Sequence, residues 1–179
     1  MIFQETKLKG SFVIRMEPIG DNRGFFARAW CQNEFKAHGL ITNFVQANIT
    51  HSPHRGTLRG LHYQIAPHQE IKLVRCTCGA IYDLIIDLRP ESPTFMQWHG
   101  TELTAGNRKM VYIPGGFAHG YQILADDTEV FYQVGQFYAP EYERGIRWDD
   151  PAFQIDWPIT GQVILSEKDK HWPDYRPEM

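Results

Sequence analysis

The sequence lacks the features that mark several common classes of protein. Its 179 residues carry a formal net charge of -3, so no basic field is available to attract nucleic acid or an anionic membrane. No stretch approaches the roughly 18 consecutive apolar residues of a membrane-spanning helix. No internal repeat, low-complexity tract or linker divides the chain. We therefore expect a single domain over residues 1–179, with neither a nucleic-acid nor a membrane partner.

Cysteine is also scarce, with three residues in the whole chain. Cys76 and Cys78 lie two positions apart on one expected strand, where their side chains would share a face, and this does not suit a disulfide. The N-terminus has no apolar run of the kind found in secretory signals. We expect reduced cysteines and a cytoplasmic protein. A zinc site through Cys76 and Cys78 is a weaker alternative, because no second Cys or His pair has matching spacing.

Short strand-like runs dominate what is present. GTLRGLHYQI, IKLVRCTCG and AIYDLIIDLR are examples, and turn-like segments such as APHQE, RPESP and TAGNR separate the runs. Turns about every 8–12 residues are typical of an all-β sandwich or barrel. Helical patterns are few. Residues 32–39 predict one short helix that ends at Gly39, and Ser166 is expected to cap a second one, with Asp169 three residues later.

Several expected strands carry polar side chains that an ordinary core would not hold. Because side chains alternate between the two faces of a strand, His62, Lys72 and Asp83 each share a face of their own strand with apolar residues. Burying such groups without partners costs roughly 2–7 kcal/mol each, so they either face solvent or line a wet cavity. Arg59 falls on the face opposite His62. Both can reach one ligand only if the strand twists or bulges at Gly60.

Two histidines in glycine-containing segments are the strongest signals from single residues. His62 lies in GTLRGLHYQ and His119 in IPGGFAHGYQ. His62 is open to three interpretations, as a structural histidine, a metal ligand or a proton-transfer group, and His119 is open to a structural or a functional role. Gln64 stands where a His-x-His metal motif needs its second histidine, and His68 and Glu70 follow in a proline-containing turn. The spacing of metal ligands is thus broken, and we expect no metal.

Taken together and in this order, eight segments resemble one known family, the dTDP-4-dehydrorhamnose 3,5-epimerases of nucleotide-sugar biosynthesis. They are DNRGFF, FVQANITHS, GTLRGLHYQ, KLVRC, YDLIIDLRPESPTF, IPGGFAHGYQIL, YAPEYERGIRWDDP and LSEKD, and they span about Phe3 to Asp169. The resemblance implies an all-β, cupin-type double-stranded β-helix (jelly roll) with a few short helices. It also implies a homodimer that acts on a nucleotide sugar without a metal or any other cofactor.

Epimerisation beside a ketone defines the groups that such a site needs. The C–H bonds at C3 and C5 of a 4-keto sugar are acidic, so the reaction requires a base, an acid across the ring and a cation for the enolate oxygen. The resemblance implies that His62 is the base, that Asp169 orients it and that Asp83 assists. It also implies that Lys72 stabilises the enolate oxygen and that Tyr132 is the acid on the opposite face.

The resemblance further implies a set of substrate-binding residues: Arg23, Arg28, Gln46, Asn48, Arg59, His119, Tyr138, Glu143 and Lys168. Of these, Arg23, Arg59, His119 and Lys168 correspond to the positions that hold the diphosphate and sugar. DNRGFF alone is equally consistent with a surface turn. Taken singly, Lys72 and Arg59 also suit solvated strand charges, Tyr132 a core aromatic and Asp169 a charge at a helix start.

Four departures from the family pattern lie close to these residues. Arg28 stands at a usual glutamate, Ala47 at a usual aspartate and Gln133 at a usual lysine, while Glu70 and Ile71 precede Lys72 where a small, glycine-containing turn is expected. The nucleotide therefore stays open. Two related activities are also open, epimerisation at C3 alone and 3,4-ketoisomerisation. A metal-dependent cupin dioxygenase and a non-catalytic sugar-binding cupin are alternatives of another class.

Overall fold

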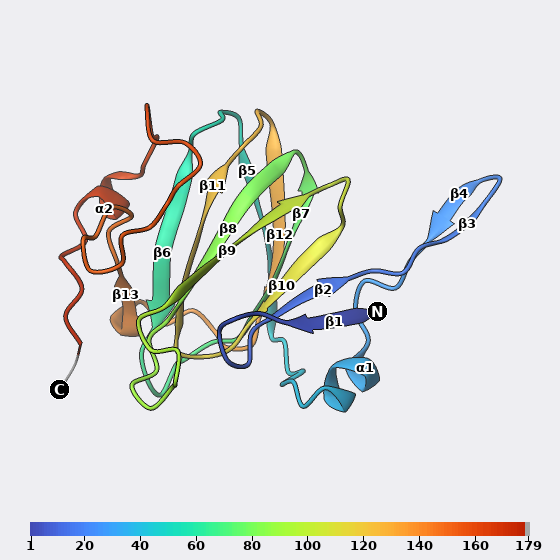
Figure 1. Cartoon of the computed structure of the whole chain (residues 1–179), viewed down its shortest axis with the longest axis horizontal. Helices are drawn as coiled ribbons and strands as arrows, with labels where there is room; N and C mark the ends of the chain where they lie inside the picture. Colours follow the sequence, from blue (N-terminus) through green and yellow to red (C-terminus); the bar gives the residue numbers. More distant parts are fainter. Residues whose placement is uncertain (178–179) are drawn as a thin grey trace.

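Two antiparallel sheets face each other in this structure, a computed structural model that describes residues 1–177 (Figure 1). The last two positions of the expected domain, 178 and 179, lie outside the described residues. The six-stranded sheet has the order β1-β2-β10-β7-β12-β5, and the five-stranded sheet has the order β13-β6-β11-β8-β9. From β5 onward the chain passes repeatedly from one sheet to the other. This is the topology of the expected jelly roll.

The first sheet contains β1 (Ile2–Glu5), β2 (Phe12–Arg15), β5 (Gln46–Ser52), β7 (Lys72–Cys78), β10 (Lys109–Ile113) and β12 (Thr128–Val134). The second contains β6 (Leu58–Gln64), β8 (Ala80–Asp87), β9 (Trp98–Thr104), β11 (Phe117–Ile123) and β13 (Glu143–Gly145). A separate hairpin consists of β3 (Ile19–Asp21) and β4 (Gly24–Phe26). The helical elements are α1 (Gln32–Ala37), the 3-10 turn η1 (Pro140–Tyr142) and α2 (Glu167–Lys170).

Both expected short helices are confirmed. Gly39, two residues after α1 ends, has a φ of +71°, a conformation that glycine adopts without the penalty of a Cβ atom. At the start of α2, the hydroxyl of Ser166 accepts a hydrogen bond from the backbone N–H of Asp169 at 3.1 Å. This cap orders a helix of four residues, which is too short to be stable by itself. It also fixes the position of Asp169.

Strand alternation divides the buried side chains into three clusters. One lies between the sheets and includes Ile85 of β8, Val111 of β10 and Tyr121 of β11. The second covers the outer face of the five-stranded sheet, where residues after β13 pack on it, and the third lies under α1 on the outer face of the six-stranded sheet. Both sheets are thus covered on their outer faces. The polar residues on their inner faces line the interior of the barrel.

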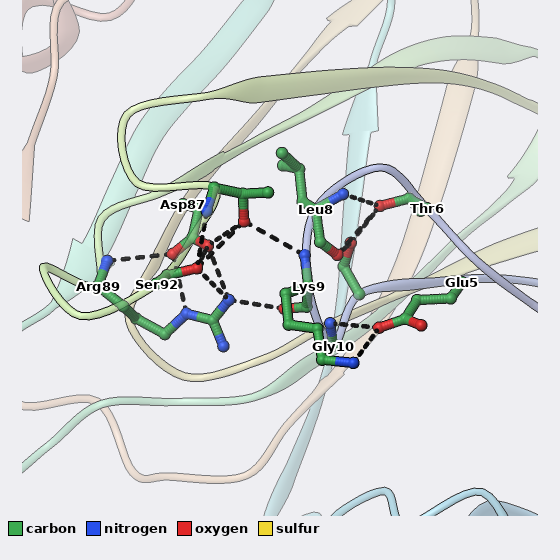
Figure 2. Close-up of polar contacts among 10 residues, drawn as sticks. Glu5, Thr6, Leu8, Lys9, Gly10, Asp87, Arg89 and Ser92 are labelled. Carbon is green, nitrogen blue, oxygen red and sulfur yellow. Dashed lines mark hydrogen bonds and ion pairs between the residues drawn. The ribbon is translucent and has the colours of Figure 1, made fainter.

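A dense polar network joins the β1–β2 connection to the end of β8 (Figure 2). Asp87 is fully buried and accepts hydrogen bonds from Arg89, Ser92 and Thr94. Burial alone would raise the pKa of Asp87, but these hydrogen bonds outweigh it and hold the pKa below its ordinary value. Arg89 also donates to the carbonyl of Lys9 at 2.6 Å, so the charged cluster anchors the first loop of the chain.

Two further expectations concern cysteines and membranes. Cys31, Cys76 and Cys78 are all free, as predicted. Burial raises the pKa of the Cys76 thiol to about 11, which makes this thiol unreactive. Among the described residues, no helix is long and apolar enough to cross a membrane.

Candidate active site

A cavity of about 440 Å³ opens inside the barrel and is lined by polar side chains from both sheets and from α2. A second cavity of about 350 Å³ adjoins it. His62, Lys72 and Tyr132 line both, so the two spaces meet at these three side chains. The sequence left open whether the polar residues face solvent or a cavity. The structure answers that question, because their strand faces point into the barrel.

His62 and Asp169 form a hydrogen-bonded pair across two elements that are distant in sequence. His62 on β6 lies with its Nε2 2.6 Å from Oδ1 of Asp169 on α2. The carboxylate is buried, which raises its pKa, yet the hydrogen bonds from His62, Ser166 and Gly60 outweigh burial and leave the pKa of Asp169 lowered. An ionised Asp169 therefore accepts a hydrogen bond from the Nε2–H group of His62. This assigns the lone pair that can accept a proton to Nδ1 of His62.

Arg59 reaches the same cavity as His62 because β6 is irregular at Gly60. The register between β6 and β11 shifts between the pairs His119–His62 and Tyr121–Arg59. Gly60 has a φ of +111°, and a Cβ atom there would lie 2.7 Å from the Cα of Gly120. Two glycines thus let the strands approach closely where the register changes. The sequence predicted that β6 twists or bulges at Gly60 if both side chains reach one ligand. The register shift confirms an irregularity there, and both side chains line the larger cavity.

Lys72 and Tyr132 lie beside each other on neighbouring strands, β7 and β12. The ammonium of Lys72 is 2.9 Å from Oε1 of Glu70, and both side chains are largely buried. Burial raises the pKa of the Tyr132 phenol, the negative charge of Glu70 raises it further, and the nearby Arg59 opposes both effects. A protonated phenol and a cation therefore face the same space as the His62 imidazole.

A second buried histidine–carboxylate pair lies behind the cavity. Nε2 of His119 is 2.8 Å from Oδ2 of Asp83, and both side chains are at most 7% exposed. The sequence associated Asp83 with His62, whereas the structure pairs it with His119. The reason is register: His119 on β11 lies two residues before Tyr121, which pairs with Asp83 on β8. Within residues 1–177, the other oxygen of Asp83 has no hydrogen-bond partner.

The smaller cavity gathers most of the other predicted substrate-binding residues. Gln46 and Asn48 on β5 line it together with Tyr138 and Glu143. The Tyr138 hydroxyl donates to Oε2 of Glu143 at 2.6 Å, and Lys168 forms an ion pair with the same oxygen at 2.5 Å. Burial would raise the pKa of Glu143, but Lys168 and Tyr138 outweigh it and lower that pKa. The carboxylate therefore joins the segment after β12 to α2.

Three comparisons with known proteins agree on one family. The family model described as dTDP-4-dehydrorhamnose 3,5-epimerase matches residues 5–176. A curated dTDP-4-dehydrorhamnose 3,5-epimerase from Pseudomonas aeruginosa is 48% identical over 168 residues, which are 92% of this chain and 92% of that protein. This chain belongs to the dTDP-4-dehydrorhamnose 3,5-epimerase family.

Solved structures of this epimerase family match the fold of the chain as well. The enzyme from Elizabethkingia anophelis superposes with a TM-score of 0.95 at 38% identity and covers 98% of this chain and 96% of that chain. The enzyme from Legionella pneumophila, solved in complex with dTDP-4-keto-L-rhamnose, has a TM-score of 0.88 at 38% identity, with 94% of this chain and 89% of that chain covered. The expected cupin-type fold is confirmed.

Two predicted binding residues of this family member lie away from the cavities of its own chain. Arg23 occupies the turn of the β3–β4 hairpin, which projects from the barrel (Figure 1), and it pairs with Asp21. The side chain of Arg23 is 85% exposed. Arg28 follows the hairpin and pairs with Glu34 of α1. The sequence predicted the turn at DNRGFF correctly, but it carried no signal for the direction in which the hairpin extends.

Sequence reasoning missed Tyr121 and Trp172, two residues that support the site. Tyr121 is buried in the larger cavity and hydrogen-bonds to Thr50, and burial raises its pKa to about 12. Its place two residues after His119 on one strand was the available signal, because both then share a face. Trp172 donates to Asp169 at 3.4 Å and packs edge-on to His62. No motif marked Trp172, since it follows α2 in an irregular segment.

Proposed function

We propose that this chain epimerises C3 and C5 of a nucleotide-diphospho-4-keto-6-deoxyhexose. The preferred reaction converts dTDP-4-dehydro-6-deoxy-D-glucose to dTDP-4-dehydro-L-rhamnose. One observation carries this function: a carboxylate-bound imidazole, a buried lysine and a protonated tyrosine share one cavity. These are the base, the cation and the acid that inversion beside a ketone requires.

The proposed reaction begins with proton removal by His62. Its Nδ1 takes the proton from C3 or C5, and the electron pair of that C–H bond moves to the carbonyl oxygen to form an enolate. Asp169 stabilises the imidazolium that results, as in other histidine–aspartate pairs. The Lys72 ammonium hydrogen-bonds to the enolate oxygen. Tyr132 then gives its phenolic proton to the opposite face of the carbon, and exchange with solvent restores both side chains.

The remaining cavity residues suit the diphosphate and the sugar. We assign Arg59, His119 and Lys168 to anionic oxygens, because guanidinium and ammonium groups pair well with phosphate. We assign Gln46, Asn48, Tyr138 and Glu143 to polar contacts in the adjoining space. Asp83 acts through His119, by holding its imidazole. The reaction needs no redox cofactor, since each proton that is removed is replaced by another.

Two related activities differ from 3,5-epimerisation in which protons are moved and on which face of the sugar. A C3-only epimerase exchanges one carbon instead of two, and a 3,4-ketoisomerase moves its proton on one face and does not need an acid opposite the base. The presence of Tyr132 in the same cavity as His62 favours epimerisation. Among residues 1–177, no group of three or more His, Cys, Asp or Glu side chains could hold a metal ion. This donor set does not favour the metal-dependent cupin dioxygenase.

Deuterium wash-in from D2O tests this function directly. The purified chain is incubated with dTDP-, CDP-, GDP- and UDP-linked 4-keto-6-deoxyhexoses, and exchange and stereochemistry at C3 and C5 are followed by NMR. We expect deuterium at both carbons with inversion, fastest for the dTDP sugar, and no change on adding a chelator. Exchange at C3 alone would make the chain a 3-epimerase. Binding without any exchange would identify a sugar-binding cupin and reject the enzyme.

We further propose that residues 1–179 form one domain, that the protein is cytoplasmic and that it assembles as a homodimer. The dimer is supported by the β3–β4 hairpin, on which Ile19, Phe25 and Phe26 are all more than half exposed. An exposed apolar hairpin and the free edge of β5 are surfaces that proteins normally cover. A partner's hairpin laid along this edge would bring Arg23 and Arg28 to a cavity of the other subunit.

Mixing two inactive variants tests this assembly. Arg23→Ala and His62→Asn each disable every site of their own homodimer, but a mixed dimer contains one site with both residues intact if Arg23 acts across subunits. We expect activity to return when the two proteins are exchanged by mild denaturation and refolding. Absence of recovery, together with a monomer mass by light scattering, would contradict the homodimer. Mixing Arg23→Ala with itself is the control.

A further inference from the structure

Glu70 lies in the smaller cavity, although the proton transfers proposed above give it no part. Its neighbour Ile71 is buried in the cluster under α1, where it packs on Gly135 and accepts a hydrogen bond from the Gly135 N–H at 2.9 Å. Successive side chains of an extended segment point to opposite sides. With Ile71 and Leu73 directed outward, Glu70 and Lys72 are both directed into the barrel.

The carboxylate of Glu70 forms an ion pair with Lys72, the lysine that faces the enolate. Their charged atoms are 2.9 Å apart, and the two side chains are only 14% and 11% exposed. At this burial the attraction is screened less than on the surface, and removal of one partner leaves the other charge without compensation. Lysine has three N–H donors, so one can bind Glu70 while the others remain available to an oxyanion.

Glu70 also lines the smaller cavity together with Tyr132, so its charge lies in the same space as the phenol. After burial, the negative charge of Glu70 is the next largest cause of the raised pKa of the Tyr132 phenol, and Arg59 opposes it. Besides Arg59, Glu70 and Lys72, the titratable groups that line these cavities with Tyr132 are His62 and Tyr63 on β6, His119 and Tyr121 on β11, Tyr138, Glu143 on β13, and Lys168 and Asp169 on α2. A carboxylate at this place thus favours the protonated form of both neighbours. It holds a cation and disfavours a phenolate.

We propose that Glu70 is a positioning residue which fixes the Lys72 ammonium at the enolate oxygen and keeps Tyr132 in its acid form. The inference rests on the proposed epimerase function and deepens it, because it says how one carboxylate supports two groups of the same site. It predicts that the alkaline limit of activity depends on residue 70, although this residue does not itself exchange a proton with the substrate.

Glu70→Gln tests the proposal, because it removes the charge and keeps the shape. We expect kcat to fall about tenfold, less than the roughly 10²–10³-fold that loss of an oxyanion donor costs. A tyrosine acid is active while protonated, so activity is lost as the pH rises through its pKa. Without the negative charge this pKa falls, and the alkaline limb of the pH–rate profile moves to lower pH. Glu70→Asp, which keeps the charge, should restore the limb.

Glu102→Gln on β9 is the matched control, since Glu102 is exposed and lies outside both cavities. It should leave kcat and the pH profile unchanged. A fall in rate for Glu70→Gln without a shift of the alkaline limb would reduce Glu70 to a structural residue and overturn the proposal. An unchanged rate and profile would overturn it as well.

A measurement without substrate separates this inference from the proposed function. Ultraviolet titration of tyrosinate, with Tyr132→Phe subtracted, reports the ionisation of Tyr132 alone. We expect it to move to lower pH in Glu70→Gln but not in Glu102→Gln. If no nucleotide sugar exchanged deuterium, the function would fail while this titration still decided whether Glu70 acts on Tyr132. Coincident titrations of wild type and Glu70→Gln would overturn the inference even in an active enzyme.

Discussion

Two regions of the molecule each bury an aspartate beside a basic side chain. They differ in whether any polar group of the region remains available to a ligand. The Asp87 carboxylate is surrounded by donors from Arg89, Ser92 and Thr94 (Figure 2). Around Asp169 the chain also supplies donors, but its partner His62 also lines a cavity. In the first region the polar groups bind one another, whereas in the second a polar side chain also lines a cavity that can hold a ligand.

The difference shows how one barrel separates stability from reactivity. Polar groups that satisfy one another hold loops together, because every buried acceptor has its donor. Polar groups that converge on an open space instead carry a cost that a substrate can offset. The Asp83–His119 pair is intermediate in this respect. One oxygen of the Asp83 carboxylate is hydrogen-bonded, and the other has no partner in the described residues. Substitutions in the two regions should therefore affect different measurements.

His62→Asn should give the largest effect on activity. The side chain is lost as a base, and general base catalysis typically contributes about 10²–10⁴-fold in rate. We expect kcat to fall by this factor while the free energy of unfolding changes little, since His62 is partly exposed. Steady-state kinetics and urea denaturation measure the two quantities. A large loss of stability with little loss of rate would show that His62 serves the fold rather than the reaction.

Tyr132→Phe should separate two steps of the reaction. The phenol supplies the proton on the face opposite His62, so its loss should spare solvent exchange more than net inversion. Deuterium wash-in and product stereochemistry, followed in the same NMR experiment, give both rates. Equal losses of exchange and inversion would contradict the role of Tyr132 as the acid across the ring.

Asp87→Asn should affect stability and leave the reaction intact. The amide supplies one acceptor where the carboxylate used both oxygens, so donors of Arg89 and Ser92 lose a charged partner. We expect unfolding to become easier by about 1–3 kcal/mol, the usual cost of a buried polar group left without its partner. Turnover should stay within about twofold of the wild type. A loss of activity at unchanged stability would show that this network serves the site.

The pH dependence of the same variant gives the smallest effect. The pKa of Asp87 is lowered in the folded state, so its stabilisation is fully present above the unfolded pKa of about 3.9 and is lost as the pH falls through the lower folded value. The difference in unfolding free energy between wild type and Asp87→Asn should therefore shrink between pH 7 and strongly acidic pH. A difference that stays constant with pH would show that the charge of Asp87 contributes nothing.

Much of the fold follows from local patterns in the sequence. Strand alternation predicted that His62, Lys72 and Asp83 lie among apolar neighbours on their strands, and the cap at Ser166 predicted the helix that carries Asp169. The irregularity of β6 at Gly60 was also predicted, as a twist or a bulge, because Arg59 and His62 otherwise point apart. These features depend on residues that are close in sequence.

The remaining features depend on register and packing between distant segments. Pairing between β8 and β11 decides that Asp83 meets His119, and no local pattern reports that pairing. No local pattern reports the direction in which the β3–β4 hairpin extends, so the sequence could not place Arg23 relative to the cavity. Trp172 likewise reaches His62 and Asp169 only because the segment after α2 folds back on β6.

The position of α2 has a consequence for a shortened chain. All strands of the barrel are complete by Gly145, and the apolar residues Phe153 and Trp157 that cover its outer face follow soon after. The carboxylate that orients His62 arrives later, on a four-residue helix near the end of the described chain. A chain cut before Ser166 would keep every strand of the barrel and lose Asp169, so His62 would have no carboxylate to orient it.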